Sequence, residues 1–297
     1  MIKLIKSWSA VKKIIFAVFL IHFSWFIIFI SINIWGINSS FPNLRQHLLI
    51  FAGVVTAILL LYFIGLRRIA IIKKAVTICT NIFLIAYASS FLWFIVCSFF
   101  NPLITLTQLS NLLQGNGLKR DYISLNQMSP YIKLAVIASE DQLYPDHNGF
   151  DLKSIKLAIK YNKKHPGRIR GASTISQQVA KNIFLWQGGG FLRKGPEVFF
   201  TFTIEQAWSK RTILERYLNI AEMGKGIFGV QAAAKTYFNK DAKDLTRAEA
   251  AQIAACLPNP KKFTVKPLSK YVAARYSFIM KQMSFLEPDP DIQALIK

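Results

Sequence analysis

Three long apolar runs in the first 103 residues constrain this chain more than any other feature of its sequence. They extend over residues 14–35, 48–66 and 75–100. As a helix, each run can cross a hydrocarbon core of about 30 Å at a rise of about 1.5 Å per residue. With 24 phenylalanines and a mean hydropathy of +0.32, the chain is too apolar for a wholly soluble protein. We therefore predict a membrane region of about three transmembrane helices over residues 1–103.

Basic residues beside these runs predict their orientation. Arg45 is the only base between the first and second runs, and none follows the third run until Lys119. The other bases lie before the first run or between the second and third: Lys3, Lys6, Lys12, Lys13, Arg67, Arg68, Lys73 and Lys74. Because basic loops stay in the cytoplasm, we expect the N-terminus inside and the C-terminal domain outside. The first run is too long for a signal-peptide core and no small-residue cleavage site follows it, so we expect it to persist.

The net charge of +22 predicts an anionic partner. Residues 1–103 carry nine Lys or Arg and no acid, so the remaining residues hold 28 bases against 15 acids. Because many bases flank the apolar runs, we expect no nucleic-acid partner. Cys79, Cys97 and Cys256 show no CxxC spacing, so neither a structural disulfide nor a zinc site is predicted.

A polar segment at 104–121 is predicted to be a linker, and residues 122–297 then read as a mainly helical domain. Its first informative stretch, 134–151, is an apolar helical run that ends at Glu140 and Asp141, shortly before Pro145. This pattern predicts Glu140 at a helix end facing a cleft, where a carboxylate can act as a general base. The alternative is that the two acids only form a solvated turn.

A basic amphipathic helix is predicted next. Leu152, Ile155 and Ile159 recur at helical spacing, and lysines fill the other faces. Two interpretations stay open for this helix. It either rests on anionic lipid headgroups or is a solvated helix packed by its apolar stripe.

Two later stretches carry polar groups suited to an anion. In residues 168–185, Thr174 and Gln177 have capping-box spacing, and Lys181 shares a helix face with Gln177. The free amide groups of such a helix start suit a phosphate, although any capped helix with a surface lysine has this pattern. Residues 193–219 are predicted to form one long helix with Pro196 in its first turn and Glu197 next to it.

Five segments of this chain, in order, resemble the peptidoglycan glycosyltransferase domain, glycosyltransferase family 51, over residues 122–285. The segments are EDQLYPDHNGFD, RGASTISQQVAKNIFL, RKGPE with WSKRTILERYLN, FGVQAAAKTYF and LTRAEAAQIAACLPNP. The resemblance is greatest to the monofunctional biosynthetic transglycosylases. It implies a mainly α, lysozyme-like domain beside the membrane, preceded by N-terminal transmembrane helices. The implied activity is polymerisation of lipid II into β-1,4-linked glycan strands with release of undecaprenyl diphosphate.

The resemblance also implies roles for individual residues. Glu140 falls on the catalytic base of the family and Glu197 on its second essential glutamate. The positions that line or support the donor and acceptor sites are Asp141, His147, Ser173, Thr174, Gln177, Gln178, Lys181, Arg193, Lys194, Ser209 and Lys210. No cofactor is required by the sequence. We expect Glu197 either to orient the neighbouring bases or to hold a divalent cation, Mg or Mn, or a proton between itself and the diphosphate.

The same resemblance implies the setting of the reaction. The expected location is the bacterial cytoplasmic (inner) membrane, with several membrane passes and the catalytic domain on the periplasmic face. The expected partners are lipid II, the growing glycan strand, membrane lipids and other cell-wall synthesis proteins. The family usually has one N-terminal span, and Gly195-Pro196 is an unusual pair within its RKxxE motif.

Two other functions compete with glycan synthesis. A lytic muramidase-type enzyme also uses one glutamate in a lysozyme-like cleft, but glycan cleavage needs no cationic diphosphate site. The second is a non-catalytic scaffold of the wall-synthesis machinery. The presence of Glu140, Glu197 and Lys181 together argues against a scaffold.

Overall fold

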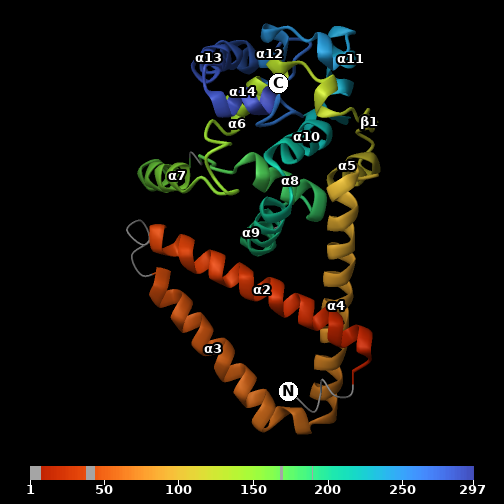
Figure 1. Ribbon diagram of the computed structural model, residues 1–297, viewed down its shortest axis with the longest axis vertical. Helices are drawn as coiled ribbons and strands as arrows, with labels where there is room; N and C mark the ends of the chain where they lie inside the picture. Colours follow the sequence, from red (N-terminus) through yellow and green to blue (C-terminus); the bar gives the residue numbers. More distant parts are fainter. Residues whose placement is uncertain (1–7, 38–43, 168–169, 189) are drawn as a thin grey trace. The chain divides into compact units, whose positions relative to one another are not determined.

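The computed structural model describes residues 8–37, 44–167, 170–188 and 190–297, and it is mainly helical as predicted (Figure 1). The chain divides into two compact units, Met1–Val96 and Cys97–Lys297. Unit 1 contains α2 (Ala10–Ile37), α3 (Leu44–Ile64), the 3-10 helix η1 (Leu66–Arg68) and most of α4 (Ala70–Phe99). The division between the units falls inside α4, whose residues from Cys97 onward belong to the second unit.

The helices of unit 1 coincide with the three apolar runs. Of the described residues, Ala10–Ser31 in α2 and the whole of α4 are long and apolar enough to cross a membrane. The described apolar part of α3, Gly53–Ile64, is shorter. His22 Nδ1 in α2 lies 3.1 Å from the Tyr87 hydroxyl in α4, so these two helices share a hydrogen bond. The number of membrane spans stays a prediction.

Unit 2 is built from short helices with a small sheet. In chain order its elements are α5 (Leu106–Leu113), β1 (Lys119–Arg120), η2 (Leu125–Gln127), α6 (Pro130–Glu140), α7 (Leu152–Lys164), α8 (Ile175–Phe184), α9 (Gly190–Ala207), α10 (Lys210–Ile220), β2 (Glu222–Gly224), β3 (Ile227–Phe228), α11 (Val230–Phe238), η3 (Ala242–Asp244), α12 (Arg247–Cys256), α13 (Lys270–Leu286) and α14 (Pro290–Ile296). The sheet has the order β1-β3-β2, with β1 parallel and β2 antiparallel to β3. Residues 104–121, predicted as a linker, thus form α5 and β1 within this unit.

The core of unit 2 surrounds α6, in which every residue from Ile132 to Ala138 is buried. Helices α12 and α13 pack against α6, and α8 packs against α9 and α10. Gly229 begins α11 with φ 82°, and a Cβ there would lie 2.5 Å from the Asn219 carbonyl oxygen, so only glycine fits. The C-terminal end of α6 and the N-terminal end of α8 lie next to each other, because Asp141 accepts the Ile175 backbone N–H.

The predicted long helix over residues 193–219 is wrong in two respects. It is two helices, because the Ser209 side chain accepts a hydrogen bond from the Thr212 backbone amide and starts α10. In addition, α9 begins at Gly190, so Pro196 lies inside the helix and not in its first turn. A Cβ added at Gly195, the residue before Pro196, would have no heavy atom within 4 Å.

Candidate active site

Glu140 is the last residue of α6, as predicted. The helix starts at the Ser129 cap with Pro130 in its first turn, and its apolar residues fix its position in the core. The next residue, Asp141, leaves the helical conformation with φ −161°. Glu140 is therefore half-buried at a helix C-terminus, where the helix dipole opposes a negative charge.

The Glu140 carboxylate accepts hydrogen bonds from neutral groups. The Gln178 Nε2 atom donates to Oε2 at 2.9 Å, and the Ser139 hydroxyl donates to Oε1 at 3.3 Å. The Tyr217 hydroxyl in turn donates to Gln178 Oε1 at 3.4 Å, which favours the orientation that turns the Gln178 amide nitrogen to Glu140. The carboxylate is thus held in place without a directly bonded cation among the described residues.

The pKa of Glu140 is raised above its usual value, chiefly because burial disfavours the charged form. The hydrogen bond from Gln178, the positive charge of Arg275 and the Ser139 hydroxyl lower it in part, while the Asp141 carboxylate raises it further. A carboxylate with a raised pKa holds a proton more readily than an ordinary one. This property suits a general base.

Asp141 and His147 bind each other next to Glu140, and Asp141 also binds the start of α8. One Asp141 oxygen accepts the backbone N–H of Ile175, the first residue of α8, at 2.9 Å. The other lies 2.9 Å from His147 Nε2. Because His147 Nδ1 accepts the Gly149 backbone N–H at 3.2 Å, we assign the proton to Nε2, which donates to Asp141. Asp141 therefore links the end of α6 to the start of α8.

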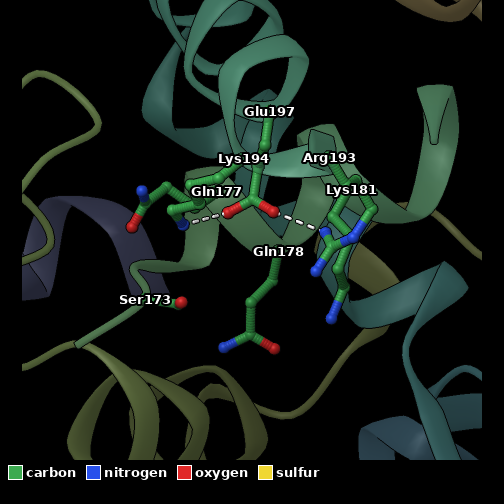
Figure 2. Close-up of a pocket in the computed structure, with 7 residues that line it drawn as sticks. All are labelled: Ser173, Gln177, Gln178, Lys181, Arg193, Lys194 and Glu197. Atoms are coloured by element: carbon green, nitrogen blue, oxygen red, sulfur yellow. Dashed lines mark hydrogen bonds and ion pairs between the residues drawn. The ribbon is translucent and has the colours of Figure 1, made fainter. Parts of the chain in front are cut away.

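Helix α8 begins with the predicted capping box. The Thr174 hydroxyl accepts the Gln177 backbone N–H at 3.2 Å, and the Gln177 side chain accepts the Thr174 backbone N–H at 3.0 Å. The Thr174 hydroxyl also donates to the Gly149 carbonyl at 2.7 Å. One turn of α8 and the start of α9 enclose a pocket lined by Ser173, Gln177, Gln178, Lys181, Arg193, Lys194 and Glu197 (Figure 2).

Glu197 lies at the centre of this pocket and is ion-paired with both neighbouring bases (Figure 2). Arg193 and Lys194 precede Glu197 by four and three residues, so the helical turn places all three on one face of α9. Arg193 pairs with one carboxylate oxygen and Lys194 with the other. Arg193 Nε also donates to the Gly188 carbonyl at 2.7 Å. Glu197 thus orients the two bases.

The pocket carries more positive than negative charge. Of the described residues that line it, Lys181, Arg193 and Lys194 are bases and Glu197 is the only acid. Burial lowers the pKa of Lys181, and the positive charges of Arg193 and Lys194 lower it further, while Glu197 and Glu140 act in the opposite direction. A bound anion would relieve this repulsion, so the described geometry suits a phosphate or diphosphate group.

Ser209 and Lys210 lie outside the lining of this pocket. Ser209 caps α10, and the Lys210 ammonium donates to the His147 carbonyl oxygen and pairs with Glu205 at 2.8 Å. Gly149, with φ +85°, lies so close to α9 that an added Cβ would be 2.9 Å from the Glu205 side chain. These contacts fix the loop after α6 against α9 and α10.

Sequence reasoning missed three residues of this region. Tyr217 on α10 orients Gln178, Arg275 on α13 acts electrostatically on Glu140, and Glu205 on α9 binds Lys210. The Ser176 hydroxyl also donates to Glu205. Tyr217 and Arg275 lie far along the chain from the residues they act on, so no local spacing indicated them. Glu205 follows an apolar stretch of α9, where the sequence suggested only a core helix.

The described residues do not form a protein-held cation site. No group of three or more His, Cys, Asp or Glu side chains in the described part of the chain could hold a metal ion. Both oxygens of Glu197 already bind cationic side chains. A divalent cation at the diphosphate stays a prediction.

Comparison with known proteins identifies the family. The family model described as "Transglycosylase" matches residues 106–284, more than half of the chain. The chain belongs to the transglycosylase family. A "Biosynthetic peptidoglycan transglycosylase" of Shigella boydii serotype 4 (strain Sb227) is 51% identical over 197 residues, covering 65% of this chain and 81% of the relative. A relative of the same name from Escherichia coli (strain K12 / DH10B) has the same identity and coverage.

The family assignment confirms the resemblance found in the sequence. The match includes α5 through most of α13, so the transglycosylase domain begins earlier than residue 122, where the resemblance was first placed. Glu140, Lys181 and Glu197 all lie inside the matched residues. Their individual roles stay proposals.

Proposed function

We propose that this chain is a peptidoglycan glycosyltransferase that polymerises lipid II into β-1,4-linked glycan strands with release of undecaprenyl diphosphate. The family and the names of the relatives support the general activity. The observation that carries the finer statement is the Glu140 carboxylate bonded to Gln178, which itself lines a pocket with three bases. A base next to an anion-binding pocket suits a transfer reaction with a diphosphate leaving group.

In the proposed reaction, Glu140 takes the proton from the 4-hydroxyl of the acceptor sugar. The hydroxyl oxygen then forms a bond to the anomeric carbon of the lipid-linked donor. The bond from that carbon to the diphosphate oxygen breaks, and the diphosphate leaves with the electron pair. A single displacement inverts the configuration of the anomeric carbon. The raised pKa of Glu140 supports this role because the carboxylate then accepts a proton more readily.

The departing diphosphate develops negative charge, which Lys181, Arg193 and Lys194 would stabilise. Their geometry is fixed before the substrate arrives, because Glu197 holds two of them and α8 holds the third. Glu197 acts here as a positioning residue, since its buried carboxylate would repel the diphosphate if it faced it directly. Lys181 and Arg193 are the groups we propose to contact the phosphates.

The test is a polymerisation assay with purified full-length protein and fluorescently labelled lipid II. We expect a ladder of glycan products on a gel, and no ladder from the Glu140→Gln variant. Preformed glycan strands serve as the second substrate. If the protein shortens these strands and leaves lipid II unchanged, it is a lytic enzyme and the proposal is wrong. If neither substrate reacts, the scaffold interpretation replaces it.

We further propose that the enzyme acts at the cytoplasmic membrane with its catalytic unit on the periplasmic face. Two helices of the described part of the chain are long and apolar enough to cross a membrane, which supports membrane association. The distribution of basic residues around the apolar runs supports the orientation. Lipid II, the growing strand, membrane lipids and other wall-synthesis proteins are its proposed partners.

A further inference from the structure

Helix α5 buries its polar side chains and exposes its leucines. Thr107, Gln108 and Asn111 are buried against unit 2. The exposed side chains are Leu106, Leu109, Leu112 and Leu113, the last with 79% of its surface exposed. A surface helix in water shows the reverse pattern, with its apolar stripe toward the core. The outward leucine face therefore needs a nonaqueous environment.

Specific hydrogen bonds fix α5 in this orientation. The Gln108 side chain donates to the Tyr122 hydroxyl at 2.9 Å, and the Gln187 side chain donates to the Thr107 hydroxyl at 2.6 Å. Asn111 binds the Thr107 carbonyl within the helix at 3.1 Å. Rotating α5 to bury its leucines would break these bonds and take the Tyr122 hydroxyl and the Gln187 side chain away from their partners on α5. The leucine face is thus a fixed part of the unit 2 surface.

Residues on both sides of α5 continue the apolar surface. Phe99, Phe100 and Leu103, which precede the helix, are all exposed, with Leu103 exposing 77% of its surface. Trp186, next to the Gln187 that binds α5, is also exposed. From residue 75 to residue 118 the sequence contains no charged side chain. Exposed Lys119 and Arg120 then follow immediately.

We propose that α5 lies along the surface of a lipid bilayer with anionic headgroups. The leucines would enter the acyl region, and Lys119 and Arg120 would meet the headgroup phosphates. A helix that is apolar on one side, followed by bases and accompanied by an exposed tryptophan, has the composition of an interfacial segment.

Chain continuity favours a bilayer over a protein partner as the occupant. Six residues separate the end of α4 at Phe99 from the start of α5 at Leu106. A segment of that length spans at most about 25 Å, so α5 cannot lie far from the end of a helix that is apolar enough to cross a membrane. The bilayer that receives α4 is therefore within reach of the leucine face.

One consequence concerns the distance between the cationic pocket and the lipid headgroups. Gln187, which binds α5, lies between α8 and α9, the two helices that enclose the cationic pocket. An α5 held in the interface would thus hold this pocket close to the headgroups. This consequence rests on the geometry of unit 2 and not on the proposed reaction.

The test measures the depth of α5 in the full chain, reconstituted at one copy per lipid nanodisc. The exposed Cys79 is first replaced by Cys79→Ala, while Cys97 and Cys256 are buried and stay. An environment-sensitive fluorophore is attached to Leu109→Cys, with Leu112→Cys as a second position if the first variant does not fold. Lys243→Cys, on the exposed polar surface of η3, is the matched control.

Lipids with a nitroxide on a shallow acyl carbon act as the quencher. We expect blue-shifted emission at Leu109→Cys and quenching about twofold or more above that of Lys243→Cys. Quenching equal to the control overturns the proposal, because the leucines then face water. Blue-shifted emission without quenching also overturns it, because a protein surface then covers them.

A second arm tests the headgroups. In nanodiscs of purely zwitterionic lipid, or with Lys119→Glu in anionic nanodiscs, the quenching at Leu109→Cys should decrease. The Lys243→Cys signal should not change in either case. Equal quenching regardless of headgroup charge overturns the anionic part of the proposal.

Discussion

Glu140 and Glu197 differ in the groups that bind their carboxylates, and this difference assigns them different chemistry. Among the described residues, Glu140 accepts hydrogen bonds from a glutamine and a serine, whereas Glu197 is paired with an arginine and a lysine. Both carboxylate oxygens of Glu197 already bind cationic side chains, so neither is placed to meet a substrate hydroxyl. Glu140 keeps its basicity and is the better candidate for the base.

The first prediction concerns Glu140→Gln in the full-length protein. We expect polymerisation to fall by about 10²- to 10⁴-fold, because the amide keeps the shape but cannot take the proton. Binding of a lipid-diphosphate analogue should stay close to that of the unaltered protein. Glu287→Gln, a change at an exposed ion pair, is the control and should polymerise normally. A folded Glu140→Gln protein with near-normal output would contradict the assignment.

The stability of Glu140→Gln gives an independent check. Because the folded state raises the pKa of Glu140, it binds this proton more tightly than the unfolded state does. The free energy of unfolding therefore decreases as the pH rises through the ordinary carboxyl range toward the raised pKa. Above that pH the charged Glu140 destabilises the fold. At neutral pH the variant should unfold at the same temperature as the unaltered protein or at a higher one.

The second prediction concerns Lys181. Lys181→Ala should weaken both analogue binding and turnover, whereas Glu140→Gln should affect turnover alone. The pKa of Lys181 is lowered, so we expect binding of the anionic analogue to weaken with rising pH earlier than an ordinary lysine would allow. Lys181→Arg should remove this pH dependence, because a guanidinium stays charged, even if its geometry binds less tightly. Unchanged binding by Lys181→Ala would place the donor diphosphate elsewhere.

At the residue scale, spacing indicated the site only where its residues are close in the chain. Thr174, Gln177 and Lys181 belong to the start of one helix, so their spacing was informative. The family resemblance indicated Gln178, Arg193 and Lys194. The bond from α8 to Glu140 comes from Gln178, 38 residues further along, and Tyr217, 77 residues further along, orients Gln178. Only tertiary packing brings such groups together.

At the scale of elements, the start of α8 was predictable, whereas the starts of α9 and α10 were not. The capping box at Thr174 starts α8, because the cap hydroxyl satisfies an amide that otherwise has no partner. The break before α10 was missed, since apolar residues continue at helical spacing across Ser209. The hydrogen bond from the Thr212 backbone amide to the Ser209 hydroxyl starts α10 as a separate helix. The spacing of apolar residues gives no sign of this bond.

Helix α10 also fixes the last turn of α4 within unit 2. The buried Arg216 donates from Nε to the Cys97 carbonyl oxygen at 3.1 Å and from Nη1 to Asn101 Oδ1 at 3.2 Å. It also pairs with Glu215 at 2.7 Å. Glu215 in turn accepts the Leu125 backbone N–H at 2.8 Å. One arginine thus satisfies a backbone carbonyl that the end of a helix leaves without a helical partner.

The third prediction is that Arg216→Leu destabilises unit 2. The change leaves the Cys97 carbonyl and Glu215 without this donor, which costs about 1–3 kcal/mol for a buried polar group. Lys235→Ala is the control, because its ion pair with Asp241 is exposed and contributes little. Thermal unfolding of the full chain in detergent is the measurement. Equal melting temperatures for the two variants would show that Arg216 does not hold the end of α4.

At the scale of the whole molecule, hydropathy and motifs predicted a helical membrane region followed by a helical transglycosylase domain. The position of the boundary between them was not predictable. Residues 104–118 lack charge and contain two glycines, which is typical of a linker, yet α5 packs there through buried polar side chains. Polarity in a sequence does not reveal whether a side chain is solvated or hydrogen-bonded to a neighbouring element.

The number of spans decides on which side of the membrane the catalytic unit lies. With a cytoplasmic N-terminus, one or three spans place residues 104–297 outside, whereas two spans place them inside. Two described helices are long and apolar enough to cross, and α3 has a shorter described apolar stretch, so the topology depends on α3. The base-rich segment between α3 and α4, with Arg67, Arg68, Lys73 and Lys74, favours a cytoplasmic loop there and therefore a crossing by α3.

The fourth prediction is therefore a topology with three spans. Alkaline phosphatase, which is active only outside the cytoplasm, should be active when fused after Lys297 and inactive when fused after Arg68. A green fluorescent protein that matures only in the cytoplasm should give the opposite result at the same two positions. Substituting Arg67, Arg68, Lys73 and Lys74 by glutamine should weaken this preference, since these bases carry the orientation signal. A phosphatase inactive after Lys297, with a fluorescent fusion there, would mean that α3 does not cross, and the catalytic unit would have to be placed in the cytoplasm.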